Sequence, residues 1–435
     1  MIRIILGLAL ILWSGAASAI EIKELTSDGG INVWVVEEPA IPFVALEIRI
    51  RGGTSLDAPE KRGATNLMMA LIEEGSGDMS AQEFQTKRES LAASFSFAAY
   101  DDTMSISARF LTENSDEALA LLRQALTQPR FDQDAIDRVR AQVLSGIASD
   151  AKNPNRIAGA YFDSAGFGDH PYGTSADGTA SSVNALTQAD MFEAHSRTIT
   201  RDRMFVSVVG DITADQVGPM LDTLLGELPA QGAGMPPHVD FALGGGVTVI
   251  DYETPQSVAL FGHSGIKRDD PDYFAAYILN EILGGSGRES RLMHEVREKR
   301  GLTYGISSFI VPKLHAELVM GQVASGNDTI AEAIEVTRAV WTDLAENGVS
   351  QGELDEIKTY LTGAYPLRFD GNAEIAGIMV GMQMIGLPTS YINTRNDELA
   401  AVTLEQVNAM AKRLLKPDAL RFVVVGQPVG LESTD

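Results

Sequence analysis

Val-Ser-Val-Val-Gly-Asp at residues 206–211 recurs as Phe-Val-Val-Val-Gly-Gln at residues 422–427, 216 positions later. Three further pairs lie in the same order at offsets of 216, 214 and 212. Loop insertions produce small changes of offset, and four ordered matches favour duplication over chance. The sequence therefore predicts an internal repeat. The further pairs are Leu186-Thr187 with Val402-Thr403, Val44–Leu46 with Val258–Leu260, and Asp57–Pro59 with Asp269–Pro271.

Strand and helix patterns follow one another irregularly within each half. Residues 45–50 alternate apolar and polar side chains, as half-buried strands do, while other stretches have the period of amphipathic helices. An irregular order favours an α+β sandwich over a doubly wound parallel sheet. We therefore predict two homologous α+β lobes. The predicted strands are Val33–Val36, Val44–Arg51, Ser94–Ala98 and Met104–Phe110, and the predicted helices are Gly63–Glu74, Ala81–Ala92, Ser115–Leu126 and Gln133–Ser149.

The two ends of the first lobe are marked by composition. Residues 1–19 contain Arg3, a short apolar run and Ala17-Ser18-Ala19, which is typical of a cleaved secretory signal rather than a membrane anchor. Residues 229–246 are rich in Gly and Pro without apolar periodicity, which indicates a linker. We therefore expect lobes at 20–228 and 247–435, in a periplasmic protein with no membrane anchor after signal removal.

Composition also narrows the classes of function. A formal charge of −25 disfavours nucleic acids and anionic lipids as partners, because both require a basic surface. The chain has no Cys, so thiol catalysis is excluded. The six His residues are too far apart in sequence for helical metal-ligand spacing. A substitute zinc site built from His170, His195 and either Glu73 or Glu74 stays open.

Four segments together resemble one family of enzymes. The pattern is similar to the pitrilysin/insulinase-type (inverzincin) zinc peptidases, in the short form shared with mitochondrial processing peptidase subunits and bacterial two-chain homologues. The resemblance covers nearly all of the chain after residue 19. It implies two lobes of one metallopeptidase-like fold that form half of a clamshell. The segments are Gly53–Gly75, His170-Pro171-Tyr172-Gly173, Val208-Val209-Gly210-Asp211 and Val296–Gly305.

The helix that should hold zinc departs from the family pattern. Active inverzincins carry His-x-x-Glu-His, in which two imidazoles bind zinc and the carboxylate activates water. In Gly63–Leu71 these places are occupied by Asn66, Met69 and Ala70, and Gly146 stands at the probable place of the distal Glu ligand. The resemblance therefore implies that this chain binds no zinc, and that zinc belongs to a partner chain.

The strongest match is Val296–Gly305, which retains the Arg and Tyr of the family at Arg297 and Tyr304. Gly301 is a natural residue to follow a helix C-terminus, so we expect Arg297 in the last helical turn and Tyr304 on the next strand. A guanidinium can hold a peptide carbonyl or carboxylate, and a phenol can donate to an oxyanion. In the family this pair reaches the zinc-bearing half across a cavity. A purely structural alternative is an ion pair of Arg297 with a helix carboxylate and a Tyr304 packed in a sheet.

Three functions follow from these observations. The preferred one is a non-catalytic subunit of a periplasmic two-chain zinc peptidase, in a heterodimer with a homologous chain that carries the intact motif. Arg297 and Tyr304 would then support peptide binding and hydrolysis at the partner's zinc. The second is a catalytically dead homodimer that binds peptides or acts as a scaffold without a zinc partner. The third, a two-lobed solute-binding protein, is disfavoured by the internal repeat and the helix-rich second half.

Overall fold

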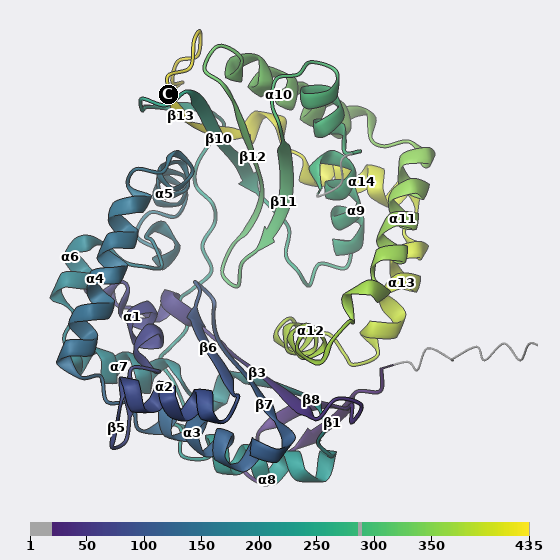
Figure 1. Ribbon diagram of the computed structural model, residues 1–435. Coiled ribbons are helices and arrows are strands. Elements are labelled where there is room, and N and C mark those ends of the chain that lie inside the picture. Colours follow the sequence, from purple (N-terminus) through teal and green to yellow (C-terminus); the bar gives the residue numbers. More distant parts are fainter. Residues whose placement is uncertain (1–19, 286–288, 435) are drawn as a thin grey trace, which may run out of the picture.

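The computed structural model describes residues 20–285 and 289–434 and contains two large β-sheets (Figure 1). The predicted signal segment, residues 1–19, lies outside the described residues. The first sheet has the order β1-β2-β8-β3-β7-β6 and the second has the order β11-β12-β10-β13-β9. The strands of the first sheet are β1 (Lys23–Thr26), β2 (Asn32–Glu37), β3 (Phe43–Arg51), β6 (Ser94–Ala99), β7 (Thr103–Leu111) and β8 (Met204–Gly210); those of the second are β9 (Gly246–Asp251), β10 (Gln256–Ser264), β11 (Ile306–Pro312), β12 (Glu317–Gly326) and β13 (Arg421–Gly426).

Five strands of the first sheet have the same topology as the five strands of the second, which confirms the predicted duplication; the first sheet has one further strand, β1, at its edge. The order β2-β8-β3-β7-β6 in the first corresponds strand for strand to β9-β13-β10-β12-β11 in the second. In both, the first pair is parallel and the remaining pairs are antiparallel. The repeated segments 206–211 and 422–427 form the equivalent strands β8 and β13. The α+β class and the two homologous lobes are therefore as predicted.

Helices cover the sheets and begin at residues that the sequence marks. Ser or Thr side chains start α2, α7, α11 and α14 by accepting a backbone N–H of the first turn. The predicted strands and helices of the first half agree with the structure to within three residues at each end. No helix in the described ranges is both long and apolar enough to cross a bilayer. The helices are α1 (Ala64–Leu71), α2 (Ala81–Ser90), α3 (Ser115–Thr127), α4 (Gln133–Asp150), α5 (Pro154–Phe167), α6 (Ala180–Ala185), α7 (Gln188–Thr198), α8 (Ala214–Leu225), α9 (Tyr273–Gly284), α10 (Ile330–Asn347), α11 (Gln351–Ala364), α12 (Asn372–Met384), α13 (Tyr391–Ala401) and α14 (Leu404–Leu414).

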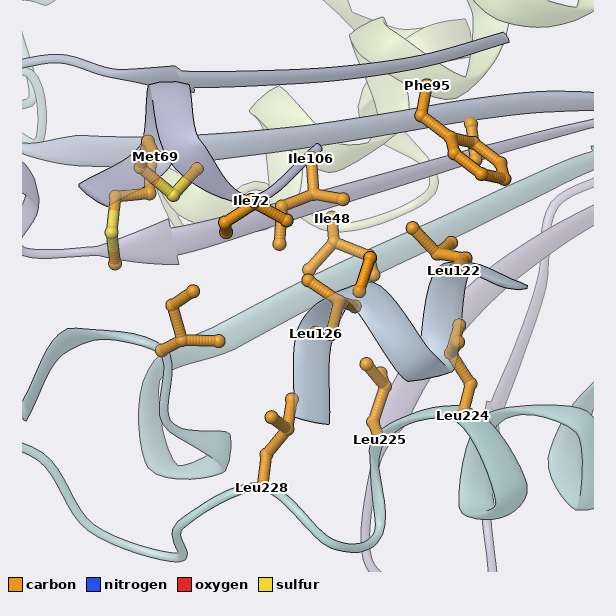
Figure 2. Close-up of a cluster of buried hydrophobic side chains, with 14 of the residues drawn as sticks. Ile48, Met69, Ile72, Phe95, Ile106, Leu122, Leu126, Leu224, Leu225 and Leu228 are labelled. Carbon is orange, nitrogen blue, oxygen red and sulfur yellow. The ribbon is translucent and has the colours of Figure 1, made fainter. Parts of the chain in front are cut away.

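The core of the first lobe lies between its sheet and its own helices. Because side chains alternate along a strand, Leu46 and Ile48 of β3 point into this core. Leucines of α3 and α8 meet them there, together with Met69 of α1 (Figure 2). The opposite face of the same sheet carries Ala45 and Val209.

One helix of each lobe packs on the sheet of the other lobe. Helix α12 of the second half packs Ala376 and Met379 on the opposite face of the first sheet. Helix α5 of the first half packs Ala158 and Phe162 on the second sheet. In Figure 1, α5 and α12 both lie between the two sheets. The two halves are therefore joined by an exchange of helices as well as by the chain.

The segment 229–245 contains no helix or strand but is packed against both halves. The Val239 N–H donates to the carbonyl of His315 at 2.8 Å, and the Ala242 N–H donates to the carbonyl of Gly166 at 2.9 Å. The Phe241 ring stacks on Phe162 with centroids 4.8 Å apart. The predicted linker is thus a fixed strap, and its last residue, 246, begins β9.

Candidate functional site

Helix α1 is anchored at its N-terminus by a carboxylate from the preceding loop. Asp57 accepts hydrogen bonds from the Gly63 N–H at 3.0 Å, the Thr65 N–H at 3.1 Å and the Thr65 hydroxyl at 2.5 Å. Burial raises the pKa of Asp57, while the bonds from Thr65 and the nearby Arg62 oppose that rise. Asp57 therefore serves to cap the helix, and it holds α1 in place although the metal ligands are missing.

Two of the four positions that hold zinc chemistry in the family have become structural, and the other two lie at the surface. The amide of Asn66 donates to Asp177 at 2.8 Å, and the Met69 side chain is only 1% exposed. Ala70 is exposed, and a Cβ at Gly146 on α4 would meet no atom within 4 Å. Within residues 20–285 and 289–434, no three His, Cys, Asp or Glu side chains are grouped so that they could hold a metal.

The residues of the possible substitute zinc site have other partners. A ring nitrogen of His170 lies 3.1 Å from the Pro237 carbonyl, and one of His195 lies 2.8 Å from the Leu126 carbonyl. Glu73 forms an ion pair with Arg88, and Glu74 forms one with Arg138. These side chains are not brought together around a common point.

The Arg297–Tyr304 segment closes a π-helix, Met293–Glu298. Gly301 follows it with φ of +66°, a conformation that favours glycine, and its N–H donates to the Arg297 carbonyl at 2.8 Å. Arg297 is therefore in the last turn, as predicted. The prediction for Tyr304 was wrong, because this residue precedes β11 by two positions.

A local side-chain network explains why the strand begins late. The Thr303 hydroxyl accepts from the Gly305 N–H at 3.0 Å and donates to the Ala324 carbonyl at 2.6 Å. Such bonds compete with the strand ladder, which begins only at the pair Ile306 and Val323. Tyr304 therefore sits at the outside of a turn, and its side chain is 88% exposed.

Neither Arg297 nor Tyr304 has a side-chain hydrogen bond or ion pair within the described part of the chain. Neighbouring charges are paired: Lys299 and Arg300 both contact Glu295, at 2.6 Å and 2.8 Å. The structural alternative, an ion-paired arginine and a tyrosine packed in a sheet, is therefore not what the structure contains. Their roles toward a substrate stay predictions.

A polar cluster between the lobes escaped the sequence analysis. Tyr172 donates to Asp102, and the same phenol accepts from the His315 N–H at 3.1 Å. Lys313 pairs with Asp101 and lies 4.2 Å from the centroid of the Tyr172 ring. Burial and the adjacent Asp102 raise the pKa of Tyr172, so the phenol stays protonated. The His-Pro-Tyr-Gly motif pointed to Tyr172, but its partners are remote in sequence. We call these five residues the interlobe cluster.

Comparisons with known proteins agree with this fold. Residues 32–180 match the family model described as insulinase (peptidase family M16), and residues 185–361 match the peptidase M16 inactive domain. The non-peptidase homolog YmxG of Helicobacter pylori is 24% identical over 426 residues, covering 98% of both chains. An uncharacterized zinc protease of Mycobacterium leprae is 25% identical, covering 92% of this chain and 91% of that one.

A solved structure gives the same result. The crystal structure of a peptidase M16 inactive domain from Pseudomonas fluorescens superposes with a TM-score of 0.88 at 28% identity, covering 95% of this chain and 99% of that one. Both halves of the chain therefore match the same family, while the side chains that bind zinc in its active members are replaced here. The chain belongs to the M16, or insulinase, family of peptidases, as a member without the His-x-x-Glu-His motif.

Proposed function

We propose that this protein is the non-catalytic, substrate-binding subunit of a periplasmic two-chain zinc peptidase. Its partner is a homologous chain with the complete His-x-x-Glu-His motif, and zinc is bound there. One observation carries the proposal: Asn66 and Met69, at two of the metal positions, are engaged within the fold, while Tyr304 is 88% exposed and its hydroxyl has no hydrogen bond among the described residues. A phenol so placed can donate to an oxyanion that forms on a neighbouring chain.

Several features support this division of roles. Met69 lies in the hydrophobic core and the Asn66 amide is hydrogen-bonded to Asp177, so neither side chain is available as a metal ligand. The M16 relatives include one described as a non-peptidase homolog and others described as zinc proteases. The family thus contains both kinds of chain that the proposed heterodimer requires. The secretory pattern in residues 1–19 supports the periplasmic location.

The test is reconstitution with a homologue that carries the complete motif, ideally one encoded beside it. We expect the two chains to copurify, and peptidase activity to appear only in the mixture and to disappear with a chelator. Tyr304→Phe removes one oxyanion donor and should lower kcat of the mixture roughly a hundredfold. Tyr360→Phe is a matched control, because Tyr360 is also exposed but lies on α11.

Two results would contradict the proposal. One is a purified chain that binds one zinc and cleaves peptides alone. The other is a reconstituted enzyme in which Tyr304→Phe and Tyr360→Phe behave alike. A stable homodimer that binds peptides regardless of chelator would instead support the scaffold function.

A further inference from the structure

A cavity of about 850 Å³ lies in the second half, away from the Arg297–Tyr304 segment. It is bounded by the loop before α9, by α9 itself, by α12 and α13, and by the short turn Pro366–Arg368. Figure 1 shows α9, α12 and α13 on the same side of the molecule. Sites for specific ligands commonly have volumes of this order. None of the residues that line the cavity belongs to the Arg297–Tyr304 segment.

Aromatic rings form much of the wall of this cavity. Phe274 and Tyr391 stack with centroids 6.3 Å apart, which joins α9 to α13. Burial raises the pKa of Tyr273, Tyr277 and Tyr365, so these phenols are neutral near pH 7. Such a surface offers flat apolar faces with hydroxyl groups at their edges, which suits both side chains and backbone of a bound peptide.

One side of α12 leaves room in the cavity. Gly377 and Gly381 lie one turn apart on α12 and both line the cavity. A Cβ at either position would meet no atom within 4 Å. The two glycines therefore keep space open that any larger side chain would fill, and neither is required by the packing of the protein itself.

Three arginines line the cavity, and none of them forms an ion pair with a carboxylate in the described part of the chain. Arg395 is only 6% exposed, and its Nη1 donates to the Leu361 carbonyl at 3.0 Å and to Asn396 at 2.9 Å. The guanidinium of Arg268 lies over the Tyr273 ring, and that of Arg368 has no hydrogen bond among the described residues. Only Arg395 of the three is buried, and its guanidinium also lies 4.5 Å from the centroid of the Tyr365 ring, while Arg268 is half-buried and Arg368 is exposed. Because no carboxylate within the described residues forms an ion pair with these guanidinium groups, an anionic ligand can pair with them.

The contrast with the rest of the chain strengthens this inference. The protein has a net charge of −25, yet the lining of the cavity contains three arginines and only two acidic residues, Asp370 and Glu374. Neither acidic residue forms an ion pair with these arginines. The three guanidinium groups come from three different elements. Several anionic groups along an extended ligand suit this arrangement better than a single headgroup does.

We propose that this cavity binds a peptide segment in which carboxylates alternate with aromatic or aliphatic side chains. The carboxylates pair with the guanidinium groups of Arg268, Arg368 and Arg395, and the apolar side chains pack on the tyrosine rings. Binding needs neither zinc nor the second chain of the proposed peptidase, so the two proposals are independent.

Calorimetric titration of the purified protein tests the site. The probe is a short synthetic peptide of glutamate, leucine and tryptophan, and its counterpart has lysine in place of glutamate. We expect only the acidic peptide to bind, with an affinity that falls as salt is raised. Arg368→Ala should weaken binding roughly tenfold, the effect of losing one charge-assisted hydrogen bond.

Gly381→Leu gives the sharper test, because it should abolish binding while the fold is kept. Replacing glycine within a helix raises helix propensity, so Tm should not fall. Arg109→Ala and Gly159→Leu are matched controls: Arg109 is exposed and unpaired among the described residues, and Gly159 is a helical glycine with open space around it. The proposal is overturned by absence of binding, by equal affinity for the lysine peptide, or by a Gly381→Leu variant that binds like the unmodified protein.

Discussion

At the scale of single residues, Met69 shows how a catalytic position becomes part of a core. In the family pattern this is the place of the water-activating Glu, whereas here the side chain is buried in the same hydrophobic cluster as Ile48, Ile72 and Leu126 (Figure 2). We expect Met69→Glu to lower the free energy of unfolding by about 3–5 kcal/mol, because it buries a carboxylate without a partner. Urea denaturation followed by circular dichroism measures this.

The control for Met69 is Met69→Leu, which keeps apolar volume and should cost less than about 1.5 kcal/mol. A Glu variant as stable as the Leu variant would show that α1 can turn this side chain to solvent. In that case the position would still be available for chemistry.

At the scale of elements, a buried histidine joins a strand to a helix. His263 of β10 accepts a hydrogen bond from the Trp341 indole of α10 at 3.1 Å and is 1% exposed. Burial lowers the pKa of His263 to about 4. The unfolded chain binds this proton near pH 6.5, so between pH 6.5 and 4 the unfolded state holds more protons and stability falls as pH falls.

The pKa of His263 differs by about 2.5 units between the unfolded and folded states. The free energy of unfolding should therefore fall by up to about 3 kcal/mol as the pH is lowered from 6.5 to 4. Unfolding free energies at pH 7 and pH 5 should differ less in His263→Gln, whose amide oxygen can still accept from Trp341. An identical pH dependence in the variant and the unmodified protein would assign the acid sensitivity to other groups.

Elements also show what sequence can and cannot predict. Strands such as β3 and helices such as α3 could be predicted because their hydrophobic pattern is visible within a short stretch of sequence. The internal repeat in turn identified β8 and β13 as equivalent strands. The position of Tyr304 was missed because a hydrogen bond from Thr303 to Ala324, on another strand, decides where β11 begins. The surroundings of Arg395 were equally hidden, since its guanidinium contacts the Leu361 carbonyl and the Tyr365 ring, which lie some thirty residues earlier in the chain.

At the scale of the whole molecule, the two halves are held together at three places. Helix α12 covers the first sheet, α5 covers the second, and the interlobe cluster joins the β6–β7 turn to the β11–β12 turn. Each half alone would expose an apolar sheet face, such as that of Trp34 and Val209. The cost of exposing such a face opposes separation.

Cleavage of the strap that joins the halves tests this directly. A specific protease site inserted after Gly234, where the chain has open space, should be cut without loss of structure. We expect the fragments 20–234 and 235–435 to elute together in size-exclusion chromatography, because the exchanged helices still bury their apolar faces. Fragments that separate without denaturant would show that the chain connection, rather than helix exchange, holds the lobes. As a further expected result, fragment 20–234 produced without the second half should self-associate or aggregate, because the apolar sheet face that α12 covers in the full chain is then exposed to water.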